Sequence, residues 1–168
     1  MSDHPRTLIL LRHAKSGYPD GVADHDRPLA PRGIREAGLA GDWLREHLPG
    51  IDTVLCSTAI RTRQTFTKLG VDAPVRYVDQ LYEATPGAVL DEINVVAENV
   101  ATLLVVGHEP TMSQLALGLA GVRGTDPRVE ARLATKFPTS GIAVLRVDGG
   151  WHGLGLGGAA LVDFHVPR

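Results

Sequence analysis

The sequence has little cysteine and little excess of charge. Cys56 is the only cysteine among its 168 residues, and one cysteine cannot form a disulfide within the chain, which favours a reducing compartment. The 17 basic and 19 acidic residues leave a net charge of -2. Such a balance supplies no broad positive field for nucleic acid or for an anionic membrane, so we expect neither as a partner. Any binding of anions must therefore be local.

Long apolar segments and internal boundaries are also missing. The first residues, MSDHPRT, are polar without an apolar signal region, and no apolar run approaches the length that spans a bilayer. We therefore expect a protein of the cytoplasm. Repeats, charge blocks and low-complexity linkers are absent, and a chain of this length can bury one core. These features predict a single domain over residues 1–168.

Apolar strands alternate with helical repeats along the first two thirds of the chain. Unbroken apolar strands are typical of a parallel sheet that helices cover on both faces. The predicted strands are residues 8–11, 51–56, 75–78 and 103–106, and the predicted helices are residues 31–48, 62–69, 89–100 and 112–119. Two further strands, 142–147 and 159–166, have no helix between them and predict an antiparallel edge. The pattern indicates an α/β fold.

Polar side chains that can carry out chemistry follow three of these strands. Arg12 and His13 follow the first strand, Arg61 lies just beyond the second, and His108 follows the strand at 103–106. The carboxyl ends of parallel strands meet at one edge of a sheet, where open α/β sheets bind ligands. Guanidinium groups match phosphoryl oxygens with two parallel hydrogen bonds. The sequence therefore predicts a phosphate-binding cleft at this edge.

Within this cleft His13 is the predicted nucleophile. Neighbouring cations disfavour imidazolium, so a neutral ring can attack phosphorus through one nitrogen. The other nitrogen must then donate, and a backbone carbonyl is its expected acceptor. Lys15 and Ser16, in the loop that follows, are expected to extend the anion pocket with an ammonium and a hydroxyl.

The motifs LLRHAKS, STAIRTRQT and VVGHEP occur in the order found in the histidine phosphatase superfamily, and RHAKS followed by RPLAPRG resembles its small phosphohistidine phosphatases, called SixA-like. The resemblance implies a phosphoglycerate mutase-like fold, a three-layer α/β/α sandwich whose mixed, mostly parallel central sheet has an antiparallel edge. It also implies that His13 becomes phosphorylated and that Arg12, Arg61 and His108 complete the phosphate pocket. Neither a metal nor an organic cofactor is implied.

A proton donor for the leaving group is predicted at Glu83, in LYEAT, which resembles the acid position of the family. Asp24 and Asp26 are the weaker alternatives. When the substrate is a phosphoramidate, its imidazole leaves as a neutral molecule once the ring nitrogen is protonated. Such a substrate has less need of an acid from the enzyme. The identity of the acid and that of the substrate are therefore linked questions.

Three other residues are expected to have structural roles. Ser57 precedes a predicted helix and is expected to cap it. Glu109 precedes Pro110 at a helix entry, where a carboxylate favours the positive end of the helix dipole, although it could instead sense substrate charge. Cys56 is expected to be a small buried side chain.

The sequence leaves several functions open. The substrate is either a phosphohistidine protein or a small phosphorylated molecule, and a mutase shares the same pocket, although a short chain leaves little room for a lid that excludes water. A phosphate-binding module without turnover is a further alternative. A metallohydrolase with His13 and His108 as ligands is disfavoured, because carboxylates at recognised ligand spacing are missing. The oligomeric state is not predicted.

Overall fold

The computed structural model describes residues 4–168, and its six strands form one sheet in the order β3-β2-β4-β1-β5-β6. The first three residues of the polar start lie outside the described part. The strands are β1 (Arg6–Arg12), β2 (Thr53–Ser57), β3 (Val75–Val78), β4 (Thr102–Gly107), β5 (Ile142–Val147) and β6 (Ala160–His165). Strands β3, β2, β4 and β1 are parallel, whereas β5 is antiparallel to both β1 and β6. The sheet is therefore mixed and mostly parallel, with the predicted antiparallel pair at one edge.

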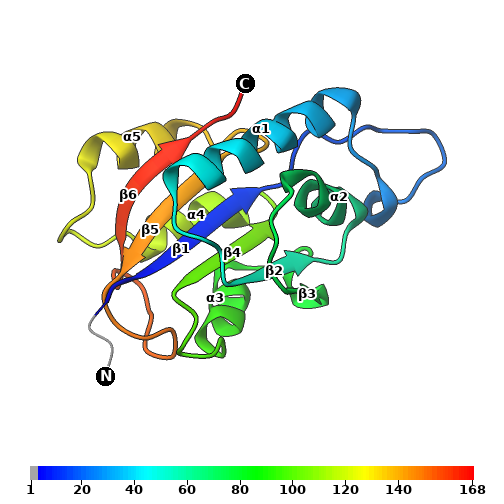
Figure 1. Ribbon diagram of the computed structural model, residues 1–168. Coiled ribbons are helices and arrows are strands. Elements are labelled where there is room, and N and C mark those ends of the chain that lie inside the picture. The colour runs from blue at the N-terminus through cyan, green and yellow to red at the C-terminus, as the bar shows by residue number, and fades with distance from the viewer. Residues whose placement is uncertain (1–3) are drawn as a thin grey trace.

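Helices cover both faces of this sheet (Figure 1). The α-helices of the described residues are α1 (Pro31–His47), α2 (Ile60–Leu69), α3 (Pro86–Asn94), α4 (Thr111–Leu119) and α5 (Pro127–Thr135). Successive side chains of a strand point to opposite faces. Accordingly Ile9 of β1 lies in a core with residues of α1 and α2, while Leu8 lies in a second core with residues of α3, α4 and α5. The three-layer α/β/α sandwich is confirmed.

Two parts of the secondary structure differ from the sequence prediction. Helix α3 ends at Asn94, not at residue 100, and the Asn94 amide donates to the carbonyls of Trp151 at 2.7 Å and Leu154 at 3.0 Å. This contact with a distant loop holds the chain where the helix stops. Helix α5 was not predicted, although Val129 and Leu133, one turn apart, are its buried residues.

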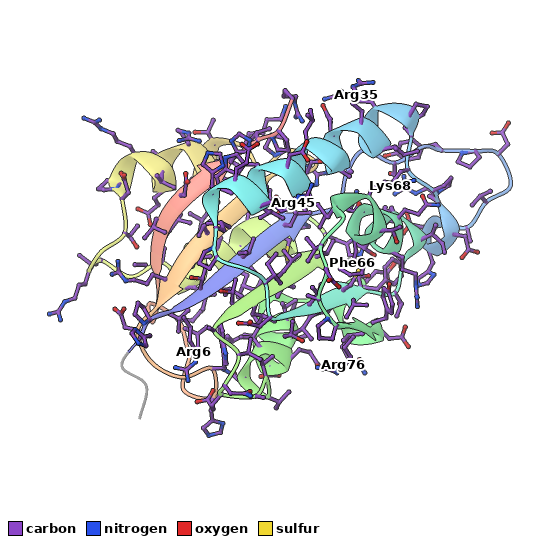
Figure 2. The ribbon with its side chains drawn as sticks, viewed as in Figure 1. Arg6, Arg35, Arg45, Phe66, Lys68 and Arg76 are labelled. Carbon is purple, nitrogen blue, oxygen red and sulfur yellow. The ribbon has the colours of Figure 1, made fainter. Side chains whose placement is uncertain are left out.

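Strands β1, β2 and β4 run in the same direction, so their carboxyl ends share one edge (Figure 1). The opposite end of β1 begins at Arg6, which Figure 2 labels. The Arg6 guanidinium donates to the backbone carbonyls of Glu98 and Gly149. The loop after β1 returns across the start of α1. A Cβ added at Gly33 would lie 2.1 Å from the carbonyl oxygen of Lys15, so only glycine permits this close packing. The approach fixes the loop beside the carboxyl end of β1.

Within residues 4–168, no helix combines the length and the apolar character that crossing a membrane requires.

Candidate active site

One cleft of about 210 Å³ lies at the carboxyl ends of β1 and β4. Its lining includes six of the residues predicted from sequence, namely Arg12, His13, Lys15, Ser16, Arg61 and His108, together with Tyr18, Arg27, Glu109 and Thr139. Segments that are far apart in the chain thus meet in one place, as the strand order requires. The cleft combines two imidazoles with four cationic side chains, those of Arg12, Lys15, Arg27 and Arg61.

His13 is held at the base of this cleft with only 7% of its surface exposed. Its backbone amide donates to the carbonyl of Gly107 at 3.0 Å, which continues the pairing of β1 with β4. Its Nδ1 lies 2.7 Å from the carbonyl oxygen of Ala14. Because a carbonyl only accepts, Nδ1 carries the proton and Nε2 keeps its lone pair. The structure thus contains the predicted carbonyl partner.

The pKa of His13 is lowered from its ordinary value of 6.5 to about 3. Burial is the largest cause, since it disfavours the charged ring. The neighbouring His108 ring and the cations Arg61 and Arg12 lower the pKa further, against the bond to Ala14. The ring is therefore neutral at physiological pH. A neutral ring with a free Nε2 is the form that can act as a nucleophile.

His108 lies next to His13, with 5.3 Å between the ring centroids. Its Nε2 is 2.8 Å from the hydroxyl of Ser57, and burial followed by the charge of Arg61 lowers its pKa to about 4. The expected capping role of Ser57 is wrong, because the N-cap of α2 is Ala59. The Ser57 hydroxyl instead accepts from the Ala59 amide at 3.3 Å and orients His108.

Arg61, on the first turn of α2, is buried and tied to the loop after β1. Its Nη1 donates to the backbone carbonyl of Asp24 at 2.7 Å, and its Nη2 lies 3.1 Å from the Asp24 carboxylate. Bonds from Tyr82 and Arg61 hold the pKa of Asp24 down at about 2. Asp24 is therefore ionised and cannot donate a proton at neutral pH. It anchors Arg61 instead.

Within residues 4–168, two buried guanidinium nitrogens have no hydrogen-bond partner. Arg12 donates from Nη1 to the carbonyl of Phe137 at 2.9 Å, but its Nε has no hydrogen-bond partner, and neither has the Nε of Arg61. Buried donors without partners are costly, so nearly all such groups in folded proteins are bonded. Two charged donors in this state beside His13 indicate a place for an anion.

The rim of the cleft contains two residues that the sequence did not single out. The Arg27 guanidinium lies 4.2 Å from the ring centroid of Tyr18 and donates to the Ser16 hydroxyl at 2.9 Å. Lys15 is exposed, with its ammonium 5.9 Å from the same ring. The loop after β1 therefore adds further cations at the entrance.

The model of the histidine phosphatase superfamily (branch 1) matches residues 8–93. The chain belongs to the histidine phosphatase superfamily. A Mycobacterium tuberculosis protein, named only as uncharacterised, is 67% identical over 94% of this chain and 100% of its own length. The phosphohistidine phosphatase SixA of Escherichia coli is 30% identical over 84% of this chain and 85% of its own. A structure from Nakamurella multipartitia, provisionally named a phosphohistidine phosphatase SixA, superposes with a TM-score of 0.90 at 43% identity, covering 98% of this chain and 97% of its own.

Glu83, the predicted proton donor of this superfamily member, does not lie in the cleft with the other predicted catalytic residues. It is exposed in the loop before α3, has a φ of 53°, and does not line the cleft. Its neighbour Tyr82 packs edge-on against His108, with 5.6 Å between the ring centroids. Asp26 lies 3.6 Å from Nδ1 of His25, also outside the cleft lining. An acid role for Glu83 stays a prediction.

Candidate metal ligands of this superfamily member are sparse. Across the described part of the chain, no three or more His, Cys, Asp or Glu side chains are grouped so that they could hold a metal ion.

We expect the rings of His13 and His108 to be neutral at about pH 6, because their pKa values of about 3 and about 4 lie well below that pH. Nitrogen-15 NMR of the imidazoles, assigned with His13→Ala and His108→Ala, measures this directly. Added inorganic phosphate should raise both pKa values, since an anion favours imidazolium. Doubly protonated rings at that pH without phosphate would contradict the burial argument.

Proposed function

We propose that this chain is a cofactor-independent phosphatase that hydrolyses phosphohistidine through a phosphorylated His13. One observation carries the proposal: the free Nε2 of a neutral, buried imidazole lies in the same cleft as two guanidinium groups whose buried Nε–H donors have no partner. The substrate class is supported by the name of the Escherichia coli relative. The proposed partner is a phosphorylated protein, and the cytoplasm is the proposed compartment.

In the first step Nε2 of His13 attacks phosphorus in line with the bond to the leaving group. A new P–N bond forms, the old bond breaks, and its electron pair stays on the leaving atom. Arg12 and Arg61 stabilise the charge on the phosphoryl oxygens. Water then attacks the phosphorus of phosphorylated His13, the P–N bond breaks, phosphate leaves with the oxygen and both protons of that water, and Nε2 regains its lone pair.

The charge state of the cleft favours a leaving group that brings its own proton. His13 and His108 are neutral, and the neighbouring Asp24 is ionised. An alkoxide is a poor leaving group and needs a proton from an acid. An imidazole protonated on its second nitrogen leaves as a neutral molecule without one. This difference supports phosphohistidine over an alkyl phosphate.

Phosphate release tests the proposal on three substrates, namely a phosphohistidine protein, a phosphoserine peptide and a small alkyl phosphate, each with and without a chelator. We expect kcat/KM to be highest for phosphohistidine, by about tenfold or more, which corresponds to about 1.4 kcal/mol of transition-state stabilisation, and unchanged by the chelator. A higher value for the alkyl phosphate would indicate a monoesterase. Binding without release would indicate a phosphate-binding module, and transfer to a second acceptor a mutase.

A further inference from the structure

Glu109 is the acidic residue among the side chains that line the cleft. It directly follows His108, at the entry to α4, and is partly buried. Every other charged side chain of the lining is a cation, supplied by Arg12, Lys15, Arg27 and Arg61. A negative charge in a cleft that takes a phosphoryl group works against binding of that group, because like charges repel. Its position in the cleft indicates that the Glu109 carboxylate binds a part of the substrate other than the phosphoryl group.

The carboxylate of Glu109 is fixed in place. Oε1 accepts from the Ser113 amide at 2.6 Å, and Oε2 accepts from the Ser113 hydroxyl at 2.8 Å. A carboxylate oxygen has two acceptor sites, so each oxygen can accept one more hydrogen bond. Burial lowers the pKa of Arg12, and the negative charge of Glu109 opposes that lowering, so the carboxylate acts on the cleft. Within residues 4–168, no cation forms a salt bridge with Glu109 within 4.0 Å.

An N-phosphorylated imidazole has a positively charged N–H group that can bind the Glu109 carboxylate. Phosphorus occupies one ring nitrogen, and the protonated second nitrogen gives the ring a positive charge and an N–H donor. We propose that Glu109 determines specificity by accepting this N–H, so that the cleft selects protonated phosphoimidazole over phosphate esters. The inference rests on the proposed phosphohistidine phosphatase function and assigns its leaving-group site.

The chemistry balances without proton transfer from the protein. Nε2 of His13 forms the new bond to phosphorus, and the electron pair of the broken P–N bond returns to the substrate nitrogen. The imidazole leaves neutral and keeps the N–H that Glu109 binds. The oxygen of an ester carries no such N–H, so an ester gains no hydrogen bond from Glu109 and meets its negative charge.

Glu109→Gln tests this assignment, because glutamine keeps an oxygen that can accept from the Ser113 amide and removes the charge. Loss of a charge-assisted hydrogen bond should lower kcat/KM for a phosphohistidine peptide by about ten- to hundredfold. For an activated aryl phosphate the same variant should raise kcat/KM by about two- to tenfold, since repulsion of the phosphoryl dianion is relieved. Glu46→Gln is the matched control, because Glu46 is exposed on α1 outside the cleft.

Opposite changes on the two substrates support the inference, with the thermal midpoint of each variant confirming that it is folded. Equal losses on both substrates overturn it, because they would mean that Glu109 only holds the start of α4. Ser113→Ala separates this case: it removes the bond to Oε2 and keeps the charge, so it should retain the preference for phosphohistidine.

A wild-type protein that cleaves the aryl ester but not phosphohistidine would overturn the proposed function and this inference together. A wild type that cleaves phosphohistidine, with equal losses in Glu109→Gln, would overturn this inference alone.

Discussion

Replacing His13 with alanine is expected to lower kcat/KM by more than about a thousandfold, the scale of removing a nucleophile. The side chain lies at the strand end beyond β1, and within residues 4–168 it makes one hydrogen bond, to the carbonyl of Ala14. The backbone bond from His13 to Gly107 survives the change. The variant should therefore fold and bind phosphate weakly while losing turnover.

Trapping the intermediate checks the same assignment independently. Brief mixing of the wild-type protein with labelled substrate, followed by alkaline quenching, should leave acid-labile phosphate on a peptide that contains His13. The label should be absent from His13→Ala. Phosphate found on Ser16, Ser57 or Cys56 would refute the nucleophile.

The thermal midpoint as a function of pH distinguishes loss of chemistry from loss of fold. Unfolded His13 binds a proton below its ordinary pKa of 6.5, whereas the folded ring does so only near about 3. The wild-type fold therefore loses stability as the pH falls from 6.5 towards 3, because the unfolded state binds more protons. His13→Ala lacks this dependence, so its midpoint should fall less across that range. A steeper fall in the variant would show that the ring stabilises the fold in acid.

The sheet could be predicted because its strands are unbroken apolar runs. Strands β1 and β4 are buried on both faces and carry no competing helical pattern. The end of α3 could not be predicted, since it depends on Asn94 reaching a loop 57 residues further along the chain. Helix α5 is short, and its two buried apolar residues are a weak periodic signal beside its Asp126 cap. The single-domain organisation stays a prediction.

The meeting of Arg12, His13, Arg61 and His108 in one cleft could be predicted, because each lies at or just beyond the end of a strand, and these strands end at the same edge. Their chemical roles stay predictions. The contact between Arg61 and Asp24 could not be predicted, since the loop that carries Asp24 has no periodic pattern. Sequence reasoning weighed Asp24 only as an acid, whereas its low pKa and its bonds make it an anchor.

That anchor leads to the second large expected effect: Arg61→Ala should lower kcat/KM by about a hundred- to a thousandfold, the typical loss of one positioned charge stabiliser. Asp24 occupies one donor on each of Nη1 and Nη2 and thereby locks the side chain. The locked guanidinium can meet the phosphoryl group without reorganising. Arg61→Lys should have a kcat/KM less than about tenfold above that of Arg61→Ala. The lysine ammonium lacks the planar guanidinium fork that can bind Asp24 and a phosphoryl group at the same time.

Arg63 provides the matched control on the same helix. Its guanidinium stacks on an aromatic ring, 4.0 Å from the centroid of Tyr77, and donates to the carbonyl of Thr58 at 2.8 Å, but it does not line the cleft. Arg63→Ala should therefore keep kcat/KM within about threefold, as expected for a residue that touches neither the cleft nor His13. Equal losses in Arg61→Ala and Arg63→Ala would show that α2 needs its arginines for folding. A loss below tenfold in Arg61→Ala alone would mean that its buried guanidinium does not meet the transferring phosphoryl group.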